Sequence, residues 1–304
     1  MIKNMRTMII GRGAVGTNVA YSLKDAPDVS FAVDKEREFR TYSPIVFNGE
    51  KLLVPTIVPN ETTEKADLVI VAVKNFQLNS TFPVIEPLLG DNTIILPLLN
   101  GIESEKILSE RFGEERVVYG FISNLSVVRE GNYVSSFSKG RITMGEKDNS
   151  ISERILKIKS FFDTYGQDVV IPEDIHHEKW LKFMTNTCFN TLTALLEADY
   201  DATGNNRDMI RAARLVAREV QTVGKKCGVE LTHDDVETMI RNTAVLTGKG
   251  RSSMFEDMAA GRETENRYFA GAVSRMGKQY SVPTPCCDIL SILVEAKRYV
   301  NSCH

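Results

Sequence analysis

The chain has 304 residues, of which 42% are hydrophobic and 25% charged, and this length is enough for two domains of a soluble globular protein. Its 37 basic and 40 acidic side chains give a formal net charge of −3. Nucleic acid and anionic membranes attract strongly basic surfaces, so this balance argues against either as the main partner.

The sequence shows no segment typical of export or of a membrane anchor. Met8–Ile10 is the only apolar run before Gly11, and Leu68–Val73 is far too short to span a bilayer. The five cysteines contain no C-x-x-C pair and no zinc-finger spacing. We therefore expect a cytoplasmic protein with reduced thiols.

The first motif lies between a short apolar strand, Thr7–Ile10, and a helix that extends to about Leu23. A second strand, Val29–Val33, completes a β-α-β unit. In this setting G-x-G-x-x-G is a dinucleotide-binding motif: the first glycine makes the turn, the second admits the pyrophosphate and the third lets helix and strand pack closely. The expected cofactor-binding residues are Gly11, Arg12, Gly13, Ala14, Val15 and Gly16.

The second strand ends at Asp34, where a carboxylate usually binds the adenosine ribose and disfavours a 2′-phosphate. Lys35 and Arg37 follow at once, and Lys74 comes at the end of a later strand. These charges leave both NADP(H) and NAD(H) open; the three cations favour NADP(H).

Two further apolar strands, Ala66–Lys74 and Thr93–Leu99, are typical of a parallel sheet buried on both faces. The first ends at Lys74 and the second is followed by Asn100. Open α/β sheets bind ligands at the carboxyl ends of their strands, so both residues are site candidates.

The rest of the first half predicts a hairpin at Ser43–Val58 with an Asn48-Gly49 turn. Short segments within Val117–Glu146 are predicted to extend the same sheet, and a helix at Ile151–Tyr165 leads to a last strand at Asp168–Ile171. Strand signals then nearly vanish. The prediction is an α/β fold: a Rossmann domain over 1–172 followed by an all-helical substrate domain over 173–304.

In the second half, Asn206–Cys227 is predicted as a long helix, and Thr232 with Asp235 resembles a capping box. The basic, hydroxyl-rich loop 248–253 precedes a short helix. Further helices are expected at about Thr264–Tyr280 and after Pro285.

Within the segment 180–196, Lys182, Asn186 and Asn190 stand at i, i+4 and i+8 among apolar residues. On an α-helix they would form one polar row about 12 Å long. Asn is a poor helix former, so two of them beneath a Lys indicate side chains that face a ligand. The alternative is a solvent-exposed stripe on an amphipathic helix.

Taken together, these motifs resemble the ketopantoate reductase (2-dehydropantoate 2-reductase) family over essentially the whole chain. The glycine motif is shared by many dehydrogenases, whereas the helical and loop motifs are more specific. The matching residues are the glycine motif, Lys74, Asn100-Gly101, Lys182-x-x-x-Asn186-x-x-x-Asn190, Ser252-Ser253-Met254-x-x-Asp257 and Glu265.

The resemblance implies that NADPH reduces 2-dehydropantoate, a 2-oxo acid, to pantoate in pantothenate and coenzyme A biosynthesis, with the active site between a Rossmann domain and a helical domain. It implies that Lys182 is the general acid and that Glu265 binds the substrate hydroxyl. It further implies that Ser253 contacts the substrate carboxylate and that Asn186 and Asn190 line the pocket. In the first domain, Asn100 would help to position cofactor and substrate, and Lys74 would lie near the adenosine phosphate. Both monomers and homodimers fit the resemblance.

Two alternatives stay open. One is an NAD(P)-dependent reductase of another 2-oxo acid, because Tyr200 stands where some members have a substrate-contacting Asn. The other is a dinucleotide sensor without catalysis, which would have no use for Lys182 and Glu265 together. Hydride transfer to a ketone leaves negative charge on oxygen, and a lysine that also donates a proton meets that need.

Overall fold

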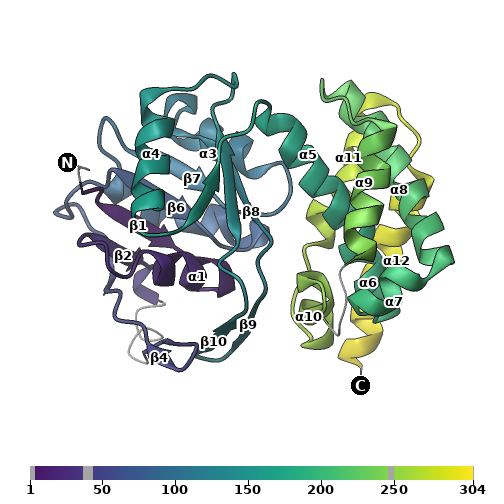
Figure 1. The fold of residues 1–304 in the computed structure, drawn as a ribbon, viewed down its shortest axis with the longest axis horizontal. Coiled ribbons are helices and arrows are strands. Elements are labelled where there is room, and N and C mark those ends of the chain that lie inside the picture. The colour runs from purple at the N-terminus through teal and green to yellow at the C-terminus, as the bar shows by residue number, and fades with distance from the viewer. Residues whose placement is uncertain (1–3, 37–43, 246–249, 304) are drawn as a thin grey trace. The chain divides into compact units, whose positions relative to one another are not determined.

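The computed structural model describes residues 4–36, 44–245 and 250–303, and the chain divides into two compact units, Met1–Ile175 and His176–His304. Figure 1 shows mixed strands and helices in the first unit and helices in the second. We placed the domain boundary near residue 172; the division between the units falls in the first turn of α5 (Ile175–Thr185).

Five parallel strands form the central sheet of the first unit, in the order β5-β2-β1-β6-β7. All residues of β1, β6 and β7 are buried, as expected when helices cover both faces. This order is that of a doubly wound dinucleotide-binding sheet, so the predicted α/β Rossmann fold is confirmed. The bounds are β1 Thr7–Ile10, β2 Val29–Ala32, β5 Thr56–Ile57, β6 Leu68–Val71 and β7 Ile94–Pro97.

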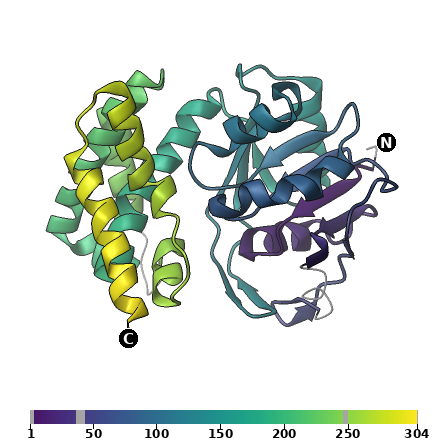
Figure 2. The same cartoon turned by 180° about the vertical axis from the view of Figure 1, so that it is seen from behind.

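Alternate side chains of the strands enter two separate hydrophobic cores, one on each face of the sheet. Ile9 lies in the first core with Val19 of α1 and Phe161 of α4, and Ile10 lies in the second with Leu108 of α3. Helices therefore cover both faces, as Figures 1 and 2 show. The bounds are α1 Ala14–Ser22, η2 Asn75–Thr81, α2 Phe82–Ile85, η3 Glu86–Leu88, α3 Ser104–Phe112, η4 Glu114–Arg116 and α4 Glu153–Thr164.

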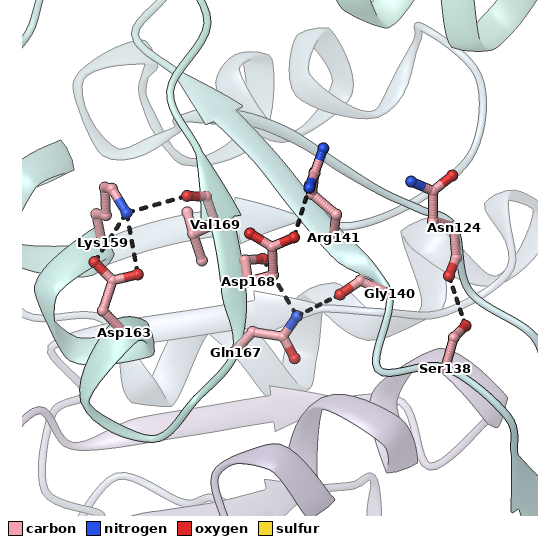
Figure 3. A network of polar contacts seen from close by, with 9 residues as sticks. All are labelled: Asn124, Ser138, Gly140, Arg141, Lys159, Asp163, Gln167, Asp168 and Val169. Carbon is pink, nitrogen blue, oxygen red and sulfur yellow. Dashed lines mark hydrogen bonds and ion pairs between the residues drawn. The ribbon is translucent and has the colours of Figure 1, made fainter.

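Three more strands continue beside β7 and are linked to it by a bridge between Ile95 and Val117. They are β8 Tyr119–Ser123, β11 Arg141–Gly145 and β12 Asp168–Val170. Figure 3 shows how they are fastened: Arg141 Nε donates to Asp168 Oδ2 at 2.7 Å, and Lys159 Nζ donates to the Val169 carbonyl at 3.1 Å.

The prediction that 117–146 adds only to this sheet was wrong for two strands. β9 (Val127–Glu130) and β10 (Tyr133–Ser136) form a separate four-stranded sheet with β3 (Val46–Phe47) and β4 (Glu50–Lys51). The chain turns away at Asn124, whose φ is 52°, directly after β8. Ser138 Oγ donates a hydrogen bond to the Asn124 carbonyl at 2.6 Å and so joins the two ends of the segment that contains β9 and β10 (Figure 3).

The hairpin expected at Ser43–Val58 is present as β3 and β4, although Ser43 itself lies outside the described residues. Asn48 and Gly49 have φ values of 48° and 86°, which fits a two-residue type I′ turn.

Among its described residues the second unit is entirely helical. The capping box of Thr232 and Asp235 is present at α9, and Asn206 caps α8, as predicted. The helix predicted from Thr264 begins only at Ala270, because a short turn, η6, and the unusual backbone of Phe269 (φ −117°, ψ −104°) precede it. The bounds are α5 Ile175–Thr185, η5 Asn186–Asn190, α6 Thr191–Leu196, α7 Tyr200–Asn205, α8 Arg207–Lys226, α9 His233–Ala244, α10 Ser253–Ala259, η6 Asn266–Tyr268, α11 Ala270–Tyr280 and α12 Pro285–Ser302.

No helix in the described part of the chain is both long enough and apolar enough to cross a bilayer.

Candidate active site

The glycine loop of the first unit has the geometry that its motif predicts. Gly11 has a φ of +111°, and a Cβ there would lie 2.5 Å from the Ala72 carbonyl oxygen. A Cβ on Gly16 would lie 1.9 Å from the Gly11 carbonyl oxygen. Only glycine fits at either position, so the loop and α1 pack against β6 as closely as backbones allow.

Gly13 is the glycine that leaves room for a ligand. It is exposed, it precedes the first residue of α1, and a Cβ there would meet nothing within 4 Å. The first turn of α1, which contains Ala14 and Val15, holds no acidic residue. The amide groups of a helix start favour phosphate, so this loop fits the pyrophosphate of a dinucleotide.

Two arginines lie beside the loop, and sequence reasoning found only Arg12. The Arg12 guanidinium lies 5.5 Å from the centre of the Phe31 ring. Arg129 of β9 donates from Nη1 to Thr17 Oγ1 at 3.5 Å, and Thr17 Oγ1 in turn donates to the Arg12 carbonyl at 3.3 Å. Partial burial and the charge of Arg129 lower the pKa of Arg12. Local sequence holds no signal for Arg129, which comes from the separate sheet.

The strand-end candidates meet at the carboxyl edge of the sheet. Lys74 is half-buried and directly precedes η2, and half-buried Asn100 follows β7. Asn75, which sequence reasoning missed, donates from Nδ2 to the Asn100 carbonyl at 2.9 Å. This hydrogen bond ties the ends of neighbouring strands β6 and β7 together.

Asp34 is half-buried directly after Val33, and Lys35 is exposed. Arg37 lies outside the described residues.

A cavity of about 450 Å³ lies at the carboxyl ends of β2 and β5. The hairpin of β3 and β4 contributes to its wall, a role that the sequence did not suggest. Its lining residues are Arg12, Val33, Pro44, Lys51, Leu52, Leu53, Val54, Thr56, Ile57 and Val58.

In the second unit, Lys182 lies in the last turn of α5 and is half-buried. Burial lowers the pKa of its ammonium group, because a low-dielectric environment disfavours the charged form. Asn186 follows one turn later on the same side, since residues four apart on an α-helix are neighbours.

The prediction that Lys182, Asn186 and Asn190 form one straight row was wrong beyond Asn186, because Asn186–Asn190 forms a π-helical turn. A π-turn holds one residue more than an α-turn, so Asn190 does not stack above Asn186 as it would on an α-helix. Asn186 is 2% exposed, whereas Asn190 is half-buried. Such turns occur often at functional sites.

The two serines of the Ser-Ser-Met segment have different surroundings. Ser252 is 2% exposed; its Oγ accepts from the Phe255 amide at 3.1 Å and pairs with Thr193 Oγ1 at 2.7 Å. Ser252 therefore caps α10 and ties it to α6. Ser253 is exposed and has no such structural role, so its hydroxyl is available to a ligand. Gly248 and Lys249 of the predicted loop lie outside the described residues.

Glu265 is 2% exposed and directly precedes η6. The next residue, Asn266, fastens this turn to α12 by donating to the Ser291 carbonyl at 2.9 Å and to Glu295 Oε1 at 3.0 Å. Asp257 accepts from Arg262 Nε at 2.9 Å and closes the segment that leads to Glu265. Since α10 also packs against η5 and α6, the second unit holds its candidate residues on connected elements.

Two family models match the chain. The model described as ketopantoate reductase PanE/ApbA matches residues 7–149, and the one described as ketopantoate reductase PanE/ApbA C terminal matches residues 174–298. Together they span both units.

Individual proteins agree with these matches over nearly full length. A 2-dehydropantoate 2-reductase of Lactococcus lactis subsp. lactis is 27% identical, covering 96% of this chain and 98% of the relative. The crystal structure of 2-dehydropantoate 2-reductase from Geobacter metallireducens GS-15 is 26% identical with a TM-score of 0.85, covering 96% of this chain and 99% of that one. D-mandelate dehydrogenase in a ternary structure with NADH and anilino(oxo)acetate is 24% identical with a TM-score of 0.85, covering 97% and 98%, and shares the fold.

Proposed function

This chain belongs to the ketopantoate reductase family, and from that premise we propose that it reduces 2-dehydropantoate to pantoate with NADPH. It is an NAD(P)-dependent oxidoreductase that acts on a small molecule. The observation that carries the proposal is a half-buried lysine, Lys182, whose pKa is lowered by burial and which lies one turn before a π-helical segment with two asparagines.

Lys182 is the proposed proton donor. When bound, the nicotinamide supplies the hydride that the keto carbon receives. Negative charge then develops on the carbonyl oxygen, and an ammonium group stabilises that charge and supplies the proton. Because burial lowers the pKa of Lys182, it releases its proton more readily than an exposed lysine.

The other polar residues of the second unit have proposed roles in binding the 2-oxo acid. Buried Glu265 would accept a hydrogen bond from the substrate hydroxyl, and exposed Ser253 would donate a hydrogen bond to the substrate carboxylate. Asn186, one turn after Lys182, and Asn190, at the end of the π-helical turn, would offer short amide groups to the substrate. In the first unit, Asn100 would position cofactor and substrate, and Lys74 would lie near the adenosine phosphate.

The test of this assignment is the rate of NADPH oxidation with 2-dehydropantoate. Lys182→Met removes the charge and the proton at similar length, and we expect kcat to fall by about 10²- to 10⁴-fold. Lys226→Met, at an exposed position on α8, is the matched control and should keep the wild-type rate. A folded Lys182→Met protein with wild-type kcat would rule out this proton donor.

A second candidate function is the reduction of another 2-oxo acid, with NADH as the alternative donor. The fold shared with D-mandelate dehydrogenase, whose structure contains NADH and anilino(oxo)acetate, favours keeping this candidate. Asp34 also fits NADH. In the second unit Tyr200, whose amide donates to the Gly250 carbonyl at 3.0 Å, places an aromatic ring where some members have Asn.

For the protein partner we propose a second copy of this chain, bound through α12. Figure 2 shows α12 along the front of the helical unit. At helical spacing it presents a row of exposed apolar side chains, and exposed apolar patches can mark protein–protein contact sites. They are Ile289, Ile292, Leu293, Tyr299 and Val300, which are 51%, 63%, 41%, 72% and 52% exposed.

A further inference from the structure

Helix α8, the longest helix in the described part of the chain, has an uneven distribution of charge. Its 20 residues include six cations and only two carboxylates. One carboxylate, Glu219, is buried and accepts hydrogen bonds from the Cys286 and Cys287 amides; the other, Asp208, lies in the first turn. The exposed surface of α8 is therefore basic, although the whole chain has a net charge of −3.

Five of the six cations lie on one line along the helix, within an arc of about 60° at 3.6 residues per turn. At ~1.5 Å per residue this line is about 27 Å long. We call it the basic ridge, and its members are Arg207, Arg211, Arg214, Arg218 and Lys225. All but Arg214, which is half-buried, are exposed. Asp208 lies about 100° around the helix from Arg207 and so does not face the ridge.

The basic ridge lacks the pairing within one helix that occurs elsewhere in this chain. On α4, for example, Lys159 pairs with Asp163 one turn later at 2.8 Å. On α8 the residue four positions after Arg207 is Arg211, and like charges at this spacing destabilise a helix. Among the described residues, an ion pair reaches the ridge only at Arg214. The ridge therefore carries a cost that an anionic partner would remove.

The ion pair at Arg214 shows which anion fits this surface. Arg214 donates from Nε and Nη2 to the two carboxylate oxygens of Glu237 on α9, both at 2.9 Å. The planar guanidinium group matches a carboxylate in this bidentate fashion. Arg211 and Arg218, on either side along the ridge, present the same donors to solvent. Further carboxylates can therefore bind in the same way.

We propose that the basic ridge is a docking surface for an acidic α-helix of another protein. A helix matches a straight line of cations, because its own carboxylates can repeat with the same 3.6-residue period and meet successive ridge residues. Nucleic acid fits less well, since a chain with a net charge of −3 repels a long polyanion, whereas a short acidic helix meets only the ridge. The proposal does not depend on the reductase activity.

Fluorescence anisotropy with two labelled peptides tests the proposal. The first is an Ala/Gln-based helix of about 20 residues, long enough to span the ridge, with Glu at the spacing of the ridge cations. The second has the same composition and helicity but carries its Glu residues around all sides. At low salt the wild-type protein should bind the first peptide at least about 10-fold more tightly, as expected for one charged hydrogen bond. This binding should weaken as salt is added, because exposed charges are screened.

Two double variants complete the test. Arg211→Gln with Arg218→Gln should weaken binding of the first peptide by about 10- to 100-fold. Lys106→Gln with Lys278→Gln removes the same charge from exposed positions on α3 and α11 and should keep the wild-type affinity.

Equal affinity for the two peptides, no binding at low salt, an unchanged affinity in the α8 variant or an equal loss in the control variant would overturn the proposal. Tighter binding of a single-stranded oligonucleotide with the same net charge would also overturn it and identify a nucleic-acid site. Failure to reduce 2-dehydropantoate would contradict the proposed function and leave this result intact.

Discussion

Alanine at Gly16 and alanine at Gly13 should have opposite consequences, although both change the same loop by one methyl group. A Cβ on Gly16 would lie 1.9 Å from the Gly11 carbonyl oxygen, and real Cβ contacts essentially never fall below 3.0 Å. Gly11 cannot retreat, since it lies against Ala72. The start of α1 must therefore move by at least about 1 Å, at an overpacking cost of about 1–3 kcal/mol.

For a domain of this size that cost lowers Tm by roughly 2–12 °C. Gly13→Ala has no such cost, because nothing lies within 4 Å of the added Cβ. The methyl group instead occupies the space where the pyrophosphate would approach. We expect Gly13→Ala to keep the wild-type Tm of the free protein and to weaken NADPH by about tenfold or more, since one lost charged hydrogen bond costs 1.5–3 kcal/mol.

Thermal unfolding of the free variants and calorimetric titration with NADPH separate the two effects. The reasoning about this loop is refuted if Gly16→Ala keeps the wild-type Tm, or if Gly13→Ala binds NADPH as tightly as the wild type.

Three further predictions concern the helical unit. Glu219 accepts hydrogen bonds from the backbone amides of Cys286 and Cys287 at 2.7 and 2.8 Å. Urea unfolding should therefore show a free energy of unfolding about 2–5 kcal/mol lower in Glu219→Ala, and a smaller loss in Glu219→Gln, which keeps one acceptor oxygen. Because burial lowers the pKa of Lys182 below the ordinary lysine value of 10.5, kcat/KM should fall as the pH rises through that lowered pKa. Lys182→Arg should move this fall to higher pH. A wild-type profile that stays flat up to pH 10 would contradict the prediction. Ile292→Glu should shift the protein from dimer to monomer in sedimentation with wild-type thermal stability, and a wild-type protein that sediments only as a monomer would exclude the α12 interface.

Local signals accounted for much of the fold. The buried strands of the central sheet, the Asn48-Gly49 turn and the capping box at Thr232 depend on neighbouring residues, and each is present. The close backbone approaches at Gly11 and Gly16 agree with the motif, because a Cβ at either position would clash with backbone.

Features that depend on distant residues were not predictable in this way. Arg129 reaches Thr17 across 112 positions, and Lys51 reaches the cavity through a hairpin whose sheet partner is β10. The π-helical turn at Asn186–Asn190 was also not predicted, because polar residues spaced four apart fit an uninterrupted α-helix equally well. The site assignments themselves stay predictions that the variants above can test.

The most direct test of the central proposal is kcat/KM for NADPH oxidation with a panel of 2-oxo acids. We predict that kcat/KM for 2-dehydropantoate exceeds the values for an unbranched 2-oxo acid of similar size and for phenylglyoxylate, because in our proposal Glu265 binds the substrate hydroxyl. This preference should collapse in Glu265→Ala. A higher value for either competitor in the wild-type protein would contradict the account and identify a reductase for a different 2-oxo acid.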